Sequence, residues 1–175
     1  MKAERRRAKK STAIRITSTR GRCPVGEKVG ERNIKAKSIP VISCEGACIR
    51  GEIARVAANM IAKQPNYQRG CHGELFTIPG SRIAQWIMSA AKVVCIDGCF
   101  LKCHSRVLEH IIDPGKLVVF DALSHYKKYY DIFDIDDVPE AERKKVARSV
   151  AQWVLKQLDE KNIPEKSCSA CKGSK

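Results

Sequence analysis

The sequence predicts a three-layer α/β domain with a mostly parallel sheet of about four strands and helices on both faces. Two observations indicate this fold class. Short apolar runs alternate along the chain with longer segments whose apolar residues recur at helical spacing, and such alternation is typical of parallel βαβ units. The length of 175 residues and the hydrophobic fraction of 43% suit one domain with its own core.

The strands are predicted from short apolar runs in a folded body that spans residues 38–161. A buried run at 39–43 reads Ile-Pro-Val-Ile-Ser, and a second run, Val-Val-Cys-Ile, lies at 93–96. Cys95, inside that second run, is expected to be a core residue. The expected strands are 39–43, 67–71, 92–96 and 116–120, with one further short strand at 13–17.

The helices are predicted between these strands. Residues 51–63 place their apolar side chains on one face, and Ser81 is positioned to cap a helix that runs through Ala90. A helix over 101–112 is expected to stop before a Pro-Gly pair, and the last helix is expected over 139–160.

The positive charge is concentrated at the start of the chain. Residues 1–37 hold 13 of the 33 Lys and Arg residues and 3 of the 19 acidic residues. This composition predicts a basic, disordered leader over 1–37, and it leaves open a tether to an anionic partner. Residues 162–175 are expected to form a flexible tail that carries a Cys-x-x-Cys pair, Cys168 and Cys171.

Nine cysteines narrow the class of protein. No apolar run is long enough to span a membrane, and no apolar segment follows the basic N-terminus, so we expect a cytoplasmic protein. Thiols stay reduced in that compartment, and the cysteine count is odd. Clustered cysteines in such a chain indicate metal binding or redox chemistry rather than disulfides.

Two loops with the same pattern gather most of these cysteines. Cys44 and Cys48 follow the first strand of the body, and Cys99 and Cys103 follow the third. Each pair is spaced Cys-x3-Cys and leads into a helix, where residues four apart share a face, and each loop has a Gly that allows a sharp turn. Cys71 lies near the end of the second strand. Because parallel strands end at one edge, these thiols are expected to converge there.

These motifs resemble the DGC-domain family, whose members are identified as zinc-binding proteins without an established activity. The resemblance covers residues 38–122 in order and approximate spacing, and it implies four chelating cysteines: Cys44, Cys71, Cys99 and Cys103. The segments that carry it are Cys-Glu-Gly at 44–46, Gly-Glu-Ile-Ala at 51–54, Cys-His-Gly at 71–73, and Asp-Gly-Cys with the later Cys at 97–103.

Two residues depart from this pattern, and a third, Asp97 within the Asp-Gly-Cys motif, has two alternative roles. Cys48 is an extra thiol and an alternative ligand, and His72 could compete with Cys71 or support the site from behind. Asp97 is expected either to hold the Cys99 turn through backbone N–H groups or to act as a second-layer partner of the metal.

Three alternatives to a zinc site stay open. An iron–sulfur cluster would use the same thiolate ligands. The spacing of Cys44 and Arg50, Cys-x5-Arg, resembles the phosphate loop of low-molecular-weight tyrosine phosphatases and arsenate reductases, in which the Cys is the nucleophile. The Cys168 and Cys171 pair could carry out thiol redox chemistry or metal transfer.

Overall fold

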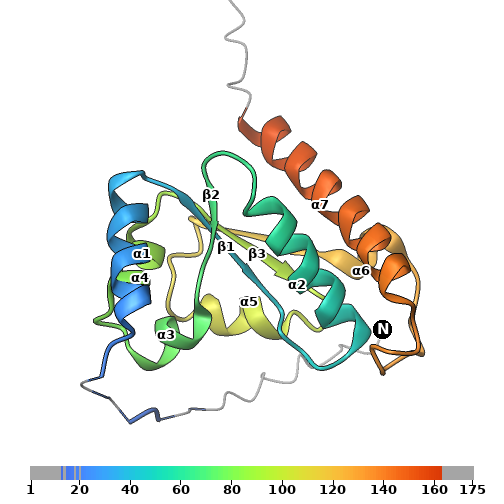
Figure 1. Ribbon diagram of the computed structural model, residues 1–175, viewed down its shortest axis with the longest axis horizontal. Coiled ribbons are helices and arrows are strands. Elements are labelled where there is room, and N and C mark those ends of the chain that lie inside the picture. Colours follow the sequence, from blue (N-terminus) through green and yellow to red (C-terminus); the bar gives the residue numbers. More distant parts are fainter. Residues whose placement is uncertain (1–12, 14, 18, 20, 163–175) are drawn as a thin grey trace, which may run out of the picture.

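The computed structural model is a four-stranded parallel sheet between two layers of helices (Figure 1). It describes residues 13, 15–17, 19 and 21–162, the last two by their backbone alone. The strands are β1 Ile39–Ser43, β2 Tyr67–Arg69, β3 Val93–Asp97 and β4 Leu117–Asp121. All four lie within two residues of the predicted bounds, so the predicted fold class is confirmed.

The strand order is β2-β1-β3-β4, which puts the first strand in the middle of the sheet. Val41 pairs with Arg69 of β2 on one side and with Val94 of β3 on the other. The connection after β1 leads to β2 on one side, and the connection after β3 leads to β4 on the other, so the order reverses between β1 and β3. Ligands of open parallel sheets bind at such a point, outside the carboxyl ends of the strands.

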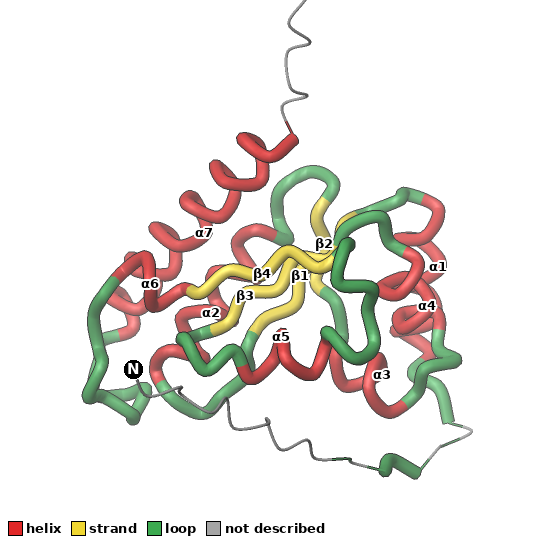
Figure 2. Tube along the Cα trace, turned by 180° about the vertical axis from the view of Figure 1, so that it is seen from behind, coloured by secondary structure: helices red, strands yellow, loops and turns green. Residues whose placement is uncertain are grey.

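The helices form two layers, as the front and rear views show (Figures 1 and 2). One layer holds α2 Ile49–Ile61, α6 Ala122–Tyr126 and α7 Glu140–Asn162. The other holds α1 Pro24–Lys35, α3 His72–Thr77, α4 Arg82–Ser89 and α5 Cys103–Leu108. In the part of the chain that the structure describes, no helix combines the length and apolar character needed to cross a bilayer.

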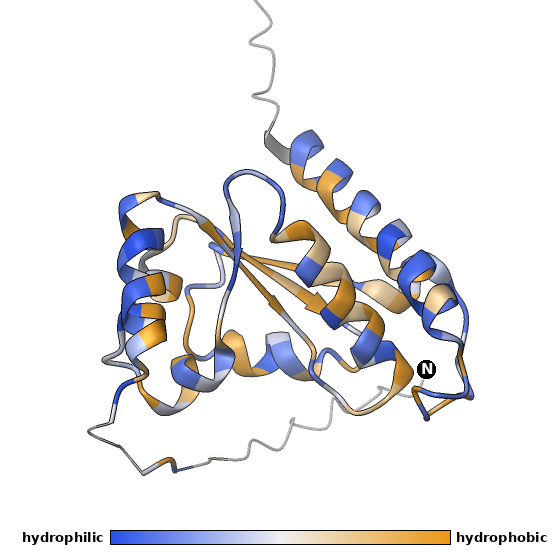
Figure 3. Cartoon of the chain, in the orientation of Figure 1, coloured by the Kyte–Doolittle hydropathy of each residue, from blue (hydrophilic) through white to orange (hydrophobic). Residues whose placement is uncertain are grey.

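Each face of the sheet has its own hydrophobic core, because alternate strand residues point to opposite faces. Val94 and Ile96 belong to the core beneath α2 and α7, whereas Val93 and Cys95 belong to the core beneath α4 and α5. The apolar sides of the helices face these strands (Figure 3). Cys95 is fully buried, as expected for a core residue.

The beginning of the folded body corrects the prediction of a disordered leader through residue 37. Helix α1 packs on α4, with Gly30 directly against the backbone of Arg82 and with the Glu27 carboxylate accepting the Arg82 N–H at 2.9 Å. Its charged side chains face outward, and its buried positions are small or polar. The sequence of α1 therefore has no apolar stripe from which a packed helix could be predicted.

Two other predictions concern the ends of the chain. The described residues at 13 and 15–17 are not in a strand, so the strand predicted there is not observed. The predicted tail, with Cys168 and Cys171, lies outside the described residues apart from the end of α7.

Candidate functional site

The loops after β1 and β3 meet at the carboxyl edge of the sheet, in close backbone contact. The Cys44 N–H donates to the Ile96 carbonyl at 2.8 Å. A Cβ on Gly98 would lie 2.7 Å from the Arg50 carbonyl oxygen, and one on Gly51 would overlap the Gly46 backbone. None of the described glycines has a positive φ. The glycines therefore serve close approach of the two loops and not the sharp turn that was predicted.

Cys44 directly follows β1 at this edge, and the groups around its thiol set its pKa. The half-buried Cys44 thiol accepts N–H groups from Gly46, at 3.4 Å, and from Gly98. Burial raises the pKa of Cys44 in spite of these hydrogen bonds, and negative charge on Asp97 and on Cys103 raises it further. The charge of Cys103, the first residue of α5, therefore acts on Cys44 although the two residues come from different loops.

Asp97 joins the end of β3 to the start of α5. Its buried carboxylate accepts the backbone N–H groups of His104 and Ser105 at 3.1 and 3.4 Å. These are orphan donors of the first helical turn, and Lys102 before them has a left-handed backbone with φ of 50° and no side-chain cap. Asp97 thus fixes the loop that carries Cys99, as one of its two predicted roles requires.

Cys48 and Cys99 both interact with the Arg50 side chain. Burial opposes ionisation of Cys48, but the N–H groups of Gly51 and Arg50 and the Arg50 guanidinium outweigh it and lower the Cys48 pKa. Charges on Cys48 and Cys99 both raise the pKa of Arg50. Charge on Cys103 acts on Cys44, and charge on Cys99 acts on Arg50, so residues of the two Cys-x3-Cys loops influence one another. The expected i,i+4 geometry is absent because α2 begins at Ile49 and α5 at Cys103.

The two residues of the Cys-x5-Arg pattern have different partners. The Arg50 guanidinium interacts with the Cys48 thiol, and its Nη1 donates to the Tyr130 carbonyl at 3.4 Å. Its Nε is buried without a hydrogen-bond partner in the described part of the chain. Glu45, within the same loop, is held toward β2 by Arg69 at 2.8 Å.

The third group lies at the β2 end of the edge. Cys71 is exposed and precedes α3, and the rings of His72 and His104 meet edge to face at 4.6 Å between centroids. Burial lowers the pKa of both histidines, so both rings are neutral near pH 7. His72 Nδ1 and His104 Nε2 are buried and have no hydrogen-bond partner among the described residues.

The donor types at this edge suit zinc, but the ligand set is not assembled. Thiols and neutral imidazole nitrogens are the ligands that zinc prefers. Among residues 21–162, no three Cys, His, Asp or Glu side chains gather as a group able to hold a metal ion. Cys103 acts electrostatically on Cys44, whereas Cys71 follows β2 and Cys99 follows β3, two strands away in the sheet.

The sequence places His104 directly after Cys103, as it places His72 after Cys71, and the structure brings the two rings together. Sequence reasoning missed two other contacts of this edge. The contact of Arg50 with Cys48 depends on where α2 begins, and the place of Tyr126 near Arg50 depends on how α6 packs against α2.

Comparison with known proteins identifies one family. Residues 40–150 match the family model of the DGC domain, which covers more than half of the chain. No curated protein and no solved structure matches the chain.

Proposed function

The chain belongs to the DGC-domain family, and we propose that it binds a zinc ion through thiolates at the carboxyl edge of its sheet. The proposed ligands are Cys44, Cys71, Cys99 and Cys103. Cys48 is the alternative to Cys99, since both thiols act on Arg50.

The close backbone contact between the loops that carry Cys44 and Cys103 is the observation that carries this proposal. The two thiols come from loops far apart in sequence and lie where the strand order reverses. Cys71 and Cys99 lie on the flanking loops after β2 and β3, so side-chain and loop adjustments would bring them toward the same ion. Thiolates are the ionised form that zinc needs, and a bound cation would offset the raised pKa of Cys44.

We propose that Asp97 and His72 hold the ligand-bearing segments in place without binding the metal themselves. Asp97 holds the loop between Cys99 and Cys103 through the start of α5. Zinc in a complete four-thiolate shell would join the three loops, and zinc with an open position would supply a Lewis acid. Both a structural and a catalytic zinc site require metal binding, and metal binding is what we propose.

Location and partner are proposed from thiols and charge. The seven described cysteines are all free thiols, which suits a reducing compartment, and we place the protein in the cytoplasm. The basic residues before the fold would attract an anionic partner, with the affinity falling as salt rises.

Metal analysis with an absorption spectrum tests the proposal, on protein purified without added metal. We expect about one zinc per chain and no visible colour. Cobalt added in place of zinc should give thiolate-to-metal charge-transfer bands. Cys44→Ser and Cys103→Ser should lose the metal and these bands. Cys23→Ser is the matched control, because Cys23 caps α1 by accepting the Gly26 N–H at 3.3 Å and serine can do the same.

Two outcomes would overturn zinc binding. Brown protein with iron and sulfide would replace it with an iron–sulfur cluster. Equal zinc content in Cys44→Ser, Cys103→Ser and Cys23→Ser would show that the metal is bound elsewhere or non-specifically.

A further inference from the structure

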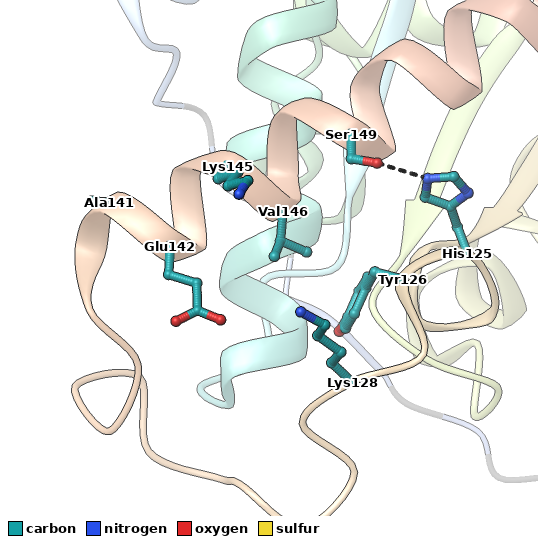
Figure 4. A pocket seen from close by; sticks show the side chains of 8 residues that line it. All are labelled: His125, Tyr126, Lys128, Ala141, Glu142, Lys145, Val146 and Ser149. Carbon is teal, nitrogen blue, oxygen red and sulfur yellow. Dashed lines mark hydrogen bonds between the residues drawn. The ribbon is translucent and has the colours of Figure 1, made fainter.

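A pocket of about 700 Å³ lies between α6 and α7, beside the cysteine edge (Figure 4). Side chains of α6 and of the loop that follows it face side chains of α7 across this space. Its volume is that of small-molecule sites in other proteins. The lining residues are His125, Tyr126, Lys128, Ala141, Glu142, Lys145, Val146 and Ser149.

The pocket carries a surplus of free positive charge. Lys128 and Lys145 form no ion pair in the part of the chain that the structure describes. Glu142 is the one carboxylate among the described lining residues, and its Oε1 accepts the Tyr129 hydroxyl at 2.5 Å. A ligand that enters this space therefore meets two ammonium groups from opposite walls and one carboxylate, so the lining keeps a net positive charge.

Neutral donors also line this pocket. The Tyr126 hydroxyl is buried and has no hydrogen-bond partner among the described residues. Ser149 Oγ lies 3.0 Å from His125 Nε2, and the His125 ring stacks on Trp153 at 4.9 Å with 10° between planes. Buried hydroxyl groups in proteins are nearly always satisfied, so the Tyr126 hydroxyl has a hydrogen bond left to donate to a group that enters from the pocket.

Arg50 adds a fixed positive charge behind Tyr126. Burial raises the Tyr126 pKa, and the nearby guanidinium opposes that rise, while charges on Cys48 and Cys99 add to it. The hydroxyl therefore stays protonated and able to donate at neutral pH. It also lies at the boundary between the pocket and the thiols.

We propose that this pocket binds a small molecule through a phosphate group. Lys128 and Lys145 would neutralise the dianion, and the Tyr126 and Ser149 hydroxyls would donate to its oxygens. A tetrahedral phosphate accepts donors from several directions, as these four are arranged. The inference does not depend on zinc binding.

Titration of the full chain with inorganic phosphate, followed by backbone amide NMR, tests this site. Chloride keeps the ionic strength constant. We expect saturable shifts at residues of α6 and the first half of α7. Lys128→Gln and Lys145→Gln should each weaken binding about tenfold, and Tyr126→Phe should weaken it about threefold. Lys156→Gln is the matched control, because it removes one α7 charge away from the pocket and should leave the affinity unchanged.

Three results would overturn the proposal. Shifts that never saturate would show that the pocket has no phosphate site. An equal loss in Lys156→Gln and Lys145→Gln would show attraction to net charge alone. Acetate that binds as tightly as phosphate, with the same response to the variants, would show that the ligand class is carboxylate.

Discussion

Gly98 is the residue at which the loop after β3 touches the start of α2. In Gly98→Ala the new methyl group would lie 2.7 Å from the Arg50 carbonyl oxygen, so the two loops must separate. We expect the free energy of unfolding to fall by about 1–3 kcal/mol. Urea denaturation followed by circular dichroism measures this change.

Gly115→Ala is the control for that substitution. A Cβ at Gly115 would meet only Asp113, with Oδ1 at 3.4 Å, which is an ordinary contact. Its free energy of unfolding should stay within about 0.5 kcal/mol of the parent protein. Similar losses in both variants would mean that the contact of Gly98 with Arg50 has no special cost.

Cys48 and Cys44 should ionise in different pH ranges. Burial raises the pKa of Cys44, whereas N–H groups and the Arg50 guanidinium outweigh burial and lower that of Cys48. Since the thiolate is the nucleophile, Cys48 should react with iodoacetamide at lower pH than Cys44. Site-resolved mass spectrometry on chelator-treated protein measures both profiles.

Arg50→Gln should move the Cys48 profile toward higher pH, because it removes the favourable charge. Arg55→Gln is matched, since this guanidinium also lies on α2 but pairs with Glu52 at 2.8 Å. The assignment fails when both variants shift the Cys48 profile equally, or when neither does.

The residue-level prediction located the thiols better than their partners. Residue order alone put Cys44 and Cys99 after strands, and the structure agrees. Which thiol acts on Cys44 depended on where the helices begin, and the Cys-x3-Cys spacing suggested a shared helical turn that the structure lacks. The loops that carry Cys44 and Cys103 meet only because β1 and β3 are adjacent in the sheet.

Helix α4 has a defined beginning at Ser81, as the sequence predicted. The buried Ser81 hydroxyl accepts the Ala84 N–H at 3.2 Å, and the helix presents Trp86 to the core. Ser81→Ala leaves that donor unsatisfied, and we expect a loss of about 1 kcal/mol in the free energy of unfolding. Chemical denaturation of both proteins measures the difference.

Ser89→Ala, at the other end of α4, tests whether the Ser81 effect belongs to the cap. The Ser89 hydroxyl donates to the Trp86 carbonyl at 3.3 Å, which is already an acceptor within the helix. This variant should change stability by less than about 0.5 kcal/mol. A loss equal to that of Ser81→Ala would contradict the capping role.

Element length decided which helices the sequence could reveal. The apolar stripes of α2 and α7 extend over several turns, so both were predicted. Helices α3 and α6 have six and five residues, too few for a periodic pattern to emerge from the residues around them. Helix α1 was missed for another reason, since its contacts with α4 use Gly30 and Glu27 rather than an apolar stripe.

For the molecule as a whole, α1 makes residues 24–35 part of the fold. Removal of residues 1–36 would uncover α4 and lose the hydrogen bond between Glu27 and the Arg82 N–H. We expect the free energy of unfolding to fall by about 3 kcal/mol or more, mainly through exposure of apolar surface. Denaturation of the shortened and full chains measures this loss.

A charge variant separates packing from electrostatics in that experiment. Replacement of Lys28, Arg32 and Lys35 by Gln keeps α1 and removes three of its positive charges. This variant should retain most of the stability of the full chain. An unchanged stability of the shortened chain would instead support a leader that contributes nothing to the fold.

The placement of β1 in the middle of the sheet sets an order for assembly during synthesis. β1 can pair with β2 as soon as residue 69 has left the ribosome, but its other edge stays open until β3 follows at residues 93–97. Every strand pair is parallel, so each pairing must close a long loop before it gains a hydrogen bond. The nascent chain therefore exposes one unpaired edge of its central strand until most of the domain has been made.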